Sequence, residues 1–430
     1  MIRFGFACKV IGIPGTAQTG LTLARASEEN LLEVSRKNLF ALGNMIKYCK
    51  TEGVALMRLS SDTIPLASHP DISFDWKEQL RDELQTLKRQ ITQTKIRASM
   101  HPGQYTVLNS PREDVVEHSA ADLVYHADFL QALGCDHSAR IVMHLGGAYG
   151  DKKEALDRFE QNFLALPKFV KDRLALENDE RIYTIENVLD MCARLSLPAI
   201  FDVFHHALNP PEHGDMGYWL NRAMSTWSSD TGPPKIHYSQ QLPGGKPGSH
   251  SLTVSLEEFL TFYESLGSRD LDVMLEVKDK NLSALKCKNL TDKGLPRKKL
   301  TDEWARYKYL VLEQSPNHYG RVRELLKSEQ PEAKDFYRHI ESALKEETTP
   351  NRAKNAAQHV WGYFDQLAGP KESRQILADL ENFEADPRAV SRVKRKLFSL
   401  AEKNQVTYLL NSLYFYFKKA GHLTLTLIPP

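Results

Sequence analysis

Short apolar runs alternate with longer amphipathic stretches over the first 280 residues, and the alternation repeats about eight times. The runs at Ile141–Leu145 and Asp272–Val277 are almost continuously apolar, which is typical of strands covered on both faces. Together the runs predict eight strands, at Ile2–Ala7, Val54–Leu59, Ile96–Met100, Ile141–Leu145, Leu174–Glu177, Ala199–Val203, Lys235–Tyr238 and Asp272–Val277.

The stretches between these runs carry apolar residues at helical spacing. Clear cases are Glu28–Lys50, Asp75–Gln90 and Val115–Leu133. Regular alternation of strand and helix predicts an α/β protein with a (β/α)8 TIM barrel. An open doubly wound sheet is the alternative, and it would gather ligands at one crevice instead of around a whole rim.

The pattern changes after the eighth run. The segment Asp279–Pro296 is rich in lysine and has no clear period, so we interpret it as a boundary. Helical spacing then dominates in Leu300–Leu326, Glu332–Lys345, Ala353–Leu367, Lys371–Glu381 and Arg388–Gly421, and a strand-like run follows at Leu423–Ile428. The sequence therefore predicts a barrel domain over residues 1–285 and an all-helical C-terminal domain of unknown role over residues 297–430.

Aromatic and basic residues are mixed in the predicted helical domain. Trp304 lies among lysines and arginines, and a basic cluster follows at Arg392, Lys394, Arg395 and Lys396. Such a surface can bind a nucleic-acid backbone. The favoured alternative is that the aromatic rings fill a helical core while the cations face water.

Composition bounds the class of protein. Apolar residues make up 41% and charged residues 26% of the chain, as in soluble globular proteins, and the net charge of +1 does not exclude a nucleic-acid partner. The five cysteines form no CxxC pair, so we expect a reducing, cytoplasmic location and no disulfide framework. The chain starts as a strand, unlike a signal peptide, and no apolar run approaches the ~20 residues that cross a membrane.

Histidines and carboxylates follow the predicted strands at or just past their ends. They are His101, His144, Glu177, Asp202, His205, His237 and Glu276. The carboxyl ends of parallel barrel strands lie on one rim, so we expect these side chains to converge. One histidine on a strand is more often a core residue, but the whole set favours a metal site with more than one ion. The run from Asp202 to His206 joins hard and borderline donors, which suits Mn²⁺ or Zn²⁺.

Four more polar residues belong to the same predicted rim. His69 is a candidate ligand or phosphate contact, whereas Arg58 and Lys278 are either phosphate contacts or ordinary solvated cations. Lys235 starts a strand and points inward or outward by alternation. If it points inward, its charge conflicts with nearby metal ions unless it is neutralised or chemically modified.

The turn His101-Pro-Gly-Gln104-Tyr105 places an amide and an aromatic ring on a loop beside the candidate ligands. There they could wedge into a base stack, or Tyr105 could cover an apolar patch. Cations on this rim would activate a water and stabilise charge on a phosphoryl group, so phosphodiester hydrolysis is the leading hypothesis. Sugar isomerisation is the competing hypothesis, because a two-metal barrel can also polarise a hydroxy-carbonyl.

Seven motifs follow one another over residues 1 to about 285: Ser68-His-Pro, Ser99-Met-His-Pro-Gly-Gln-Tyr, Met143-His-Leu-Gly-Gly-Ala-Tyr-Gly, Leu176-Glu-Asn-Asp-Glu, Asp202-Val-Phe-His-His-Ala-Leu-Asn-Pro, Pro234-Lys-Ile-His and Glu276-Val-Lys. This set resembles the UV damage endonuclease family, whose barrels are related to endonuclease IV and xylose isomerase. The resemblance implies nicking of damaged double-stranded DNA immediately 5′ of pyrimidine dimers, 6-4 photoproducts and abasic sites. It also implies a cluster of two or three Mn²⁺ ions, with Zn²⁺, Mg²⁺ or Co²⁺ as alternatives, and no obligate protein partner.

Carried over by motif, the resemblance implies a set of metal ligands. His101, His144 and Glu177 would bind one ion; Glu177 would bridge to a second, completed by Asp202, His237 and Glu276; His205 and His250 would hold a third. The sequence places no carboxylate beside His250. The expected catalytic residues are Glu177, Glu276, His69 and Lys235, and Lys235 matches a lysine that is carboxylated in part of the family.

The resemblance also implies how the lesion is recognised. Gln104 and Tyr105 match residues that probe the lesion from the opposite side of the duplex. Phe6 and Val10 stand where relatives carry a tyrosine and an asparagine, so Phe6 would keep a stacking face and lose a hydroxyl. That departure affects the expected lesion preference and not cleavage. A damage-binding protein with purely structural metals is a further alternative.

Overall fold

The computed structural model describes residues 1–386, 388–420 and 424–427. Contacts between residues divide the chain into two compact units. The first contains Met1–Val10, Gly15–Val254 and Thr261–Leu285, and the second contains Ile11–Pro14, Ser255–Leu260 and Lys286–Pro430. Each unit is considered by itself below. None of the described helices combines the length and the apolar character that a membrane span requires.

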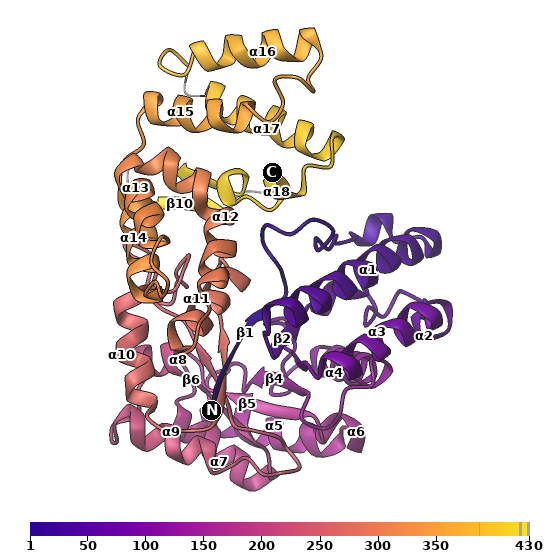
Figure 1. Cartoon of the computed structure of the whole chain (residues 1–430). Helices are drawn as coiled ribbons and strands as arrows, with labels where there is room; N and C mark the ends of the chain where they lie inside the picture. The colour runs from indigo at the N-terminus through magenta and orange to yellow at the C-terminus, as the bar shows by residue number, and fades with distance from the viewer. Residues whose placement is uncertain (387, 421–423, 428–430) are drawn as a thin grey trace. The chain divides into compact units, whose positions relative to one another are not determined.

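Eight parallel strands close into a barrel in the first unit, with β1 hydrogen-bonded to both β2 and β8. They are β1 (Ile2–Ala7), β2 (Leu56–Leu59), β3 (Arg97–Met100), β4 (Arg140–His144), β5 (Leu174–Glu177), β6 (Ala199–Asp202), β7 (Lys235–Tyr238) and β8 (Leu271–Leu275). Figure 1 shows these strands surrounded by helices. The predicted (β/α)8 TIM barrel is confirmed, and the open-sheet alternative is wrong because the sheet has no free edge.

The strands are joined by helical segments of very different length: η1 (Leu23–Arg25), α1 (Glu28–Glu52), η2 (Ser61–Thr63), α2 (Trp76–Gln79), α3 (Arg81–Thr94), α4 (Glu113–Ala132), α5 (Lys152–Ala165), α6 (Lys168–Lys171), α7 (Ile185–Leu195), α8 (Val203–Leu208), α9 (Met216–Met224), α10 (Leu256–Leu266) and α11 (Asn281–Thr291). Local sequence sets the limits of α1. The Ser27 side chain accepts a hydrogen bond from the Asn30 N–H at its start, and Gly53 takes the left-handed conformation at its end.

Register decides which side chains meet inside the barrel. On β7, Lys235 and His237 are two residues apart, so both side chains project to the same face, which is the interior. Pairing places His144 beside Glu177 on β4 and β5, and Asp202 beside His237 on β6 and β7. Two pairs of candidate ligands therefore lie side by side at the carboxyl ends of neighbouring strands.

The predicted boundary segment Asp279–Pro296 contains a helix that the sequence did not predict, α11 (Asn281–Thr291), and the division between the two units falls inside the segment, between Leu285 and Lys286. Nearly every residue of this helix from Asn281 to Cys287 is buried, including a serine and a lysine. A helix that is buried all round needs no apolar stripe, so the periodicity that identifies surface helices is missing.

The second unit is mainly helical, as predicted. It contains α12 (Arg297–Gln314), α13 (Pro316–Leu325), α14 (Ala333–Lys345), α15 (Pro350–Trp361), α16 (Pro370–Glu381), α17 (Arg388–Lys403), α18 (Thr407–Leu410), η3 (Leu413–Phe415), and the antiparallel pair β9 (Phe417–Ala420) and β10 (Thr424–Leu427). The predicted helix over 300–326 is broken where Ser315 caps α13 and Pro316 occupies its first turn. The helix predicted from Arg388 to Gly421 ends at Lys403; Gly421, Leu423 and Ile428 lie outside the described residues.

The interior of the second unit accounts for its aromatic and basic residues. Trp304, Tyr307 and Tyr309 are buried, so the aromatic rings of this segment fill the core. Lys394 forms a buried ion pair with Glu313 at 2.6 Å. Arg392 and Lys396 both pair with Asp379 at 2.8 Å. The predicted basic cluster is thus largely matched by carboxylates, which argues against a nucleic-acid surface there.

Candidate metal centre and active site

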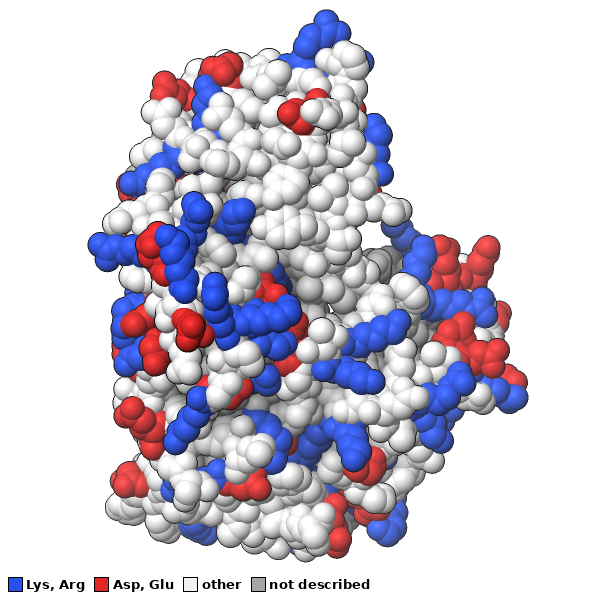
Figure 2. Space-filling view, in the orientation of Figure 1, with Lys and Arg blue, Asp and Glu red and all other residues white. Residues whose placement is uncertain are grey.

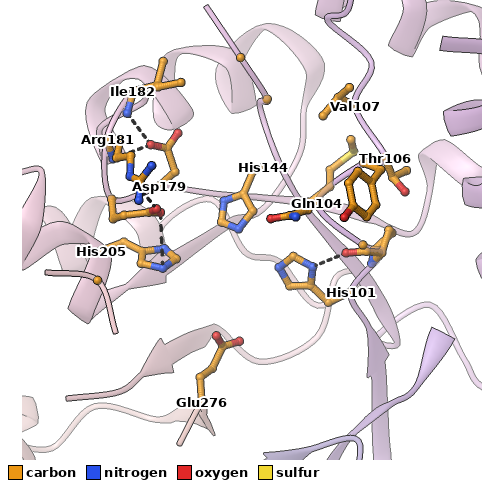
Figure 3. A pocket seen from close by; sticks show the side chains of 18 of the residues that line it. His101, Gln104, Thr106, Val107, His144, Asp179, Arg181, Ile182, His205 and Glu276 are labelled. Atoms are coloured by element: carbon orange, nitrogen blue, oxygen red, sulfur yellow. Dashed lines mark hydrogen bonds and ion pairs between the residues drawn. The ribbon is translucent and has the colours of Figure 1, made fainter. Parts of the chain in front are cut away.

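The mouth of the barrel holds a cavity of about 890 Å³. Its walls come from the ends of several strands and from the loops that follow them. Figure 3 shows His101, His144, His205 and Glu276 directed toward a common space, with Gln104 at its edge. The rim predicted from the strand ends is therefore a real cavity, and most of the predicted donors line it or lie just beneath it.

Glu177, at the end of β5, is the centre of the arrangement. One carboxylate oxygen lies 3.0 Å from His101 Nε2 and 3.6 Å from His144 Nε2. The other oxygen lies 2.6 Å from His237 Nδ1. Glu177 itself is only 1% exposed, so both oxygens are committed to these imidazoles and not to water.

Three sets of side chains bring their donor atoms within 4.8 Å of one another, close enough to share a cation, and Glu177 belongs to all three. The sets are His101, His144 and Glu177; Glu177, His237 and Glu276; and Glu177, Asp202 and His205. The first matches an expected ligand group, and the second matches another except that Asp202 is not in it. In the third, His205 is grouped with Asp202 and Glu177, whereas the sequence paired it with His250.

Asp202 and His205 are fixed by the way β6 turns into α8. Asp202 caps this short helix, and its Oδ1 accepts a hydrogen bond of 2.7 Å from the His205 N–H. The side chain of Asn178 bonds the backbone of Asp202, and the carbonyl of Asn178 lies 2.9 Å from His205 Nδ1. Both candidate ligands are therefore held in place before any ion arrives.

The pKa values reflect the crowding of carboxylates and imidazoles. Burial raises the pKa of Asp202 to about 6, although the neighbouring His205 opposes the shift. Burial would lower the pKa of His205, but the charges of Asp202 and Glu177 outweigh it and raise this pKa to about 9. The pKa of His237 is raised in the same way, because the carboxylates of Glu177 and Glu276 overcome its burial. In the absence of an ion, protons on the imidazoles offset the carboxylate charge.

The residues fit a metal cluster on grounds independent of any comparison. On the candidate ligands, three buried atoms have no hydrogen-bond partner among the described residues: His144 Nδ1, Asp202 Oδ2 and His237 Nε2. Buried polar atoms without partners are costly, so they indicate a ligand that satisfies them or their neighbours. The mixture of imidazole and carboxylate donors suits Mn²⁺ or Zn²⁺.

Arg58, on β2, is not a solvated cation. Its guanidinium forms an ion pair with Glu276, just after β8, and both side chains are 13% exposed on the wall of the cavity. Burial would raise the pKa of Glu276, but Arg58 and His237 hold it well below its ordinary value. Lys278, the other predicted phosphate contact, is exposed and lies outside the residues that line the cavity.

Lys235 points into the barrel, one layer below His237. It is 1% exposed, and its Nζ has no hydrogen-bond partner in the described part of the chain. Burial, with the nearby charge of Arg97, holds the pKa of Lys235 well below its usual range. Asp272 is the neighbouring acid, but it already pairs with Arg3 and Arg97, each at 2.5 Å. Lys235 therefore points inward as one of the two alternatives predicted, and its lowered pKa favours the neutral form in which no charge conflict arises.

His250 lines the cavity beside His205, with ring centroids 6.2 Å apart, and its Nδ1 lies 2.8 Å from Ser239 Oγ. The sequence shows no carboxylate next to it, and in the structure the carboxylate whose charge acts on His250 is Glu276. Glu180, on the loop after β5, lines the same cavity and places an oxygen 4.0 Å from His205 Nε2. No linear spacing connects Glu180 to His205, so only the fold could identify this contact.

Three further predicted residues lie elsewhere. Phe6 is fully buried and packs edge-on against Tyr48 of α1, with ring centroids 6.4 Å apart. Its predicted stacking face for DNA is therefore wrong, because alternation along β1 turns Phe6 toward the helical layer. His69 does not line the cavity; its Nδ1 lies 3.2 Å from the Asp71 N–H, so its predicted role rests on the motif alone. Val10 is also buried.

The loop after β3 carries Gln104 and Tyr105 on the wall of the cavity. Tyr105 is 81% exposed, so it does not cover an apolar patch, and its ring is accessible to a ligand. The sequence missed three other residues near the centre. Cys8 and Tyr149 line the cavity, and the charge of Lys280 acts on His250. No spacing rule identifies them, because each lies on an irregular segment with a positive φ.

Comparison with known proteins places both parts of the chain. Residues 2–297 match the family model described as UV-endonuclease UvdE, and residues 308–417 match a protein of unknown function (DUF1722). The chain is 37% identical over 351 residues to the UV DNA damage endonuclease of Clostridium perfringens (strain 13 / Type A), covering 80% of this chain and 83% of that one. It is 34% identical to the UV DNA damage endonuclease of Bacillus velezensis, covering 66% and 92% of the two chains. The crystal structure of SacUVDE matches with a TM-score of 0.63 and 38% identity, over 67% of this chain and 96% of that one.

Proposed function

The chain belongs to the UV damage endonuclease family, and from that premise we propose that it nicks UV-damaged double-stranded DNA. The bond cut would be the phosphodiester immediately 5′ of a pyrimidine dimer, a 6-4 photoproduct or an abasic site. The observation that carries the proposal is the convergence of three cation-competent groups on Glu177 at the bottom of an open cavity.

The metal ions we propose are two or three Mn²⁺, for which Zn²⁺, Mg²⁺ or Co²⁺ could substitute. His101, His144 and Glu177 would hold one ion, and Glu177, His237 and Glu276 a second. Asp202, which the structure groups with Glu177 and His205, would complete the second site. His205 and His250 would hold a third, with Glu180 as the nearby carboxylate. Bound ions of this kind generate a hydroxide-like nucleophile near neutral pH and stabilise the charge that develops on a phosphoryl group.

The chain's own residues prepare this site. Arg58 holds the Glu276 carboxylate in place and keeps it ionised, while Asn178 fixes the backbone of Asp202. Lys235 would act below the cluster. Its uncharged form, or a carboxylated form, would remove the buried positive charge that otherwise opposes cation binding. We assign His69 a phosphate or ligand contact on the motif alone.

Recognition would rest on the loop after β3. Gln104 and Tyr105 reach the wall of the cavity from this loop, and the Tyr105 ring is accessible. A damaged base pair is weakly stacked, so extruding it costs less than extruding a normal pair, by a few kcal/mol. An exposed ring at the mouth would fill the space that the extruded nucleotide leaves. Figure 2 shows Lys and Arg mixed with Asp and Glu on the face that it draws, so a near-zero net charge still leaves cations for phosphate contacts.

A nicking assay tests the proposal. Supercoiled plasmid irradiated with UV should be converted to the open circle in the presence of Mn²⁺, and EDTA or Glu276→Gln should abolish the conversion. Asp190→Asn is the matched control, because Asp190 is an exposed carboxylate on α7, outside the cavity. Nicking that persists in EDTA would refute the metal mechanism. Turnover of a free ketose without nicking would favour the sugar isomerase, and tight binding of damaged duplex without product would favour a binding protein.

A further inference from the structure

The loop after β4 carries an aromatic residue in an unusual conformation. Tyr149 has φ +50°, in the left-handed region that glycine and asparagine favour and bulky residues avoid. Its side chain lines the cavity beside His144, and the residue is 48% exposed. Core packing therefore does not explain why a tyrosine occupies this strained position. Backbone strain of this kind is often found at residues that contact a ligand. The exposed ring is therefore a candidate ligand contact.

The ring is held in one place. It lies against Gly147, where an added Cβ would come within 3.1 Å of two ring atoms, so the absence of a side chain there lets the ring sit on the backbone. The guanidinium of Arg158 lies 5.8 Å from the ring centroid, and Arg158 Nε donates a 3.0 Å hydrogen bond to the Asn109 carbonyl. The Gly147 carbonyl accepts hydrogen bonds from Asn109 Nδ2 at 2.6 Å and from the Tyr183 hydroxyl at 3.2 Å.

We propose that Tyr149 is a second aromatic contact for DNA, which stacks on an unpaired nucleobase at the mouth of the cavity. The inference rests on the proposed function, because it needs a damaged duplex as the ligand. Tyr105 and Tyr149 follow the neighbouring strands β3 and β4 and line one cavity, so both rings can serve one distorted segment of DNA. A ring that is already fixed loses little freedom on binding, and stacking accepts any base because every base has a flat face.

Three substitutions test the role of the Tyr149 ring separately from that of its backbone conformation. Tyr149→Asn keeps a residue suited to the left-handed conformation and removes the ring, whereas Tyr149→Phe keeps the ring. Gly147→Ala leaves Tyr149 in place and pushes on its ring. Tyr218→Asn is the matched control, because Tyr218 is 50% exposed, has Arg222 over its ring at 5.9 Å and does not line the cavity.

We expect Tyr149→Asn to raise KM for a duplex with one abasic site about tenfold, with kcat within twofold of wild type. Tyr149→Phe should restore KM to near the wild-type value, Gly147→Ala should give a smaller rise, and Tyr218→Asn none. Because the substitution relieves backbone strain, the midpoint of thermal unfolding of Tyr149→Asn should equal or exceed that of wild type. A lower midpoint together with a higher KM would overturn the proposal, since the ring would then be a packing residue.

Fluorescence supplies a readout without cleavage. A 2-aminopurine placed beside the abasic site, with the full chain in EDTA, should be quenched by wild type and by Tyr149→Phe, and less by Tyr149→Asn. Equal quenching by wild type and Tyr149→Asn would overturn the stacking contact while leaving the nuclease proposal intact. Wild-type protein that neither nicks nor binds the damaged duplex would instead refute the proposed function, so the two failures are distinguishable.

Discussion

Buried charge is arranged in opposite ways at the mouth of the barrel and in the core of the helical unit. At the mouth, the carboxylates of Glu177, Asp202 and Glu276 gather in one place, and Asp202 Oδ2 has no hydrogen-bond partner among the described residues. In the helical unit, Glu313 faces a single cation, Lys394, at 2.6 Å. The ion pair in the helical unit is complete as it stands, whereas the carboxylate group at the mouth is unfavourable until positive charge is added.

This difference distinguishes a ligand-binding site from a structural ion pair, and it does so from the structure alone. A matched buried pair is costly to break but needs nothing further. A group of like charges with unsatisfied atoms is unfavourable, and it persists only because the rest of the barrel is stable enough to hold its side chains in place. Such groups are typical of functional sites. The raised pKa values of Asp202 and His237 reflect the burial of Asp202 and this crowding of negative charge around both groups, because each group binds a proton more readily than it would in water.

The largest effect is expected for Glu177→Gln, which tests the role of the carboxylate group at the mouth of the barrel. Because Glu177 belongs to all three cation-competent groups, we expect nicking to fall at least about 1000-fold and the bound metal to fall with it. Stability of the metal-free protein should fall as well, because the ionised Glu177 carboxylate contacts His101 and His237 and offsets their charge. Metal analysis, plasmid nicking and urea unfolding in EDTA measure these effects. Metal content and nicking that survive the substitution in the folded protein would show that Glu177 is not a ligand.

The opposite outcome is expected for Lys394→Ala in the helical unit. Removing the cation leaves Glu313 buried and unpaired, which should cost about 3–5 kcal/mol of unfolding free energy. The metal content of the folded protein should stay at the wild-type level. Arg395→Ala, an exposed neighbour on α17, is the control and should change little. Unfolding in urea measures the difference, and equal effects of the two substitutions would contradict the pairing.

The affinity for Mn²⁺ should rise with pH in two steps. In the metal-free protein, Asp202 has a pKa of about 6 and His205 one of about 9, and both must lose a proton to bind an ion. These two residues alone make the affinity rise about 100-fold per pH unit below pH 6, where two protons are released, and about tenfold per unit from there to pH 9. His237, whose pKa is also raised, adds to this slope where it titrates. Calorimetry in buffers of different ionisation enthalpy counts these protons. Affinity that does not change with pH would exclude both residues as ligands.

The smallest effect is expected for Tyr105→Ala. The ring is 81% exposed and touches the cavity only from its loop, so its loss should leave the metal content unchanged. Preference for damaged over undamaged duplex should fall about tenfold, the worth of one stacking contact. Competition binding measures the preference, with Phe40→Ala, another exposed ring, as control. Equal loss of metal and of discrimination would mean that the loop is structural.

Much of the barrel could be predicted from sequence because its signal is local. The strands Ile2–Ala7, Leu174–Glu177 and Lys235–Tyr238 have the predicted limits, since an apolar run buried on both faces begins and ends with its polar neighbours. The convergence of ligands followed from one rule, that parallel strand ends share a rim. The same logic failed at α11, where burial on all sides removes the amphipathic pattern on which helix prediction depends.

Other features of the site depend on information that linear spacing does not hold. Phe6 was assigned by motif, but alternation along β1 decides which face it joins, and that face is the helical layer. Glu180 approaches His205 only because the loop after β5 folds back over the cavity. The position of the Tyr149 ring depends on a positive φ, which cannot be predicted from the presence of a tyrosine in the sequence.

The donors to the centre stand mainly on strands, whereas Tyr105 and Tyr149 stand on the loops that follow β3 and β4. Strand positions are locked by the hydrogen-bond ladder of the closed barrel, while loops of this fold tolerate exchange. Under the proposed roles, hydrolysis depends on strand positions and lesion recognition on loop positions. Substitutions confined to the two loops would then change which lesion is bound and leave the metal ligands on the strands unchanged.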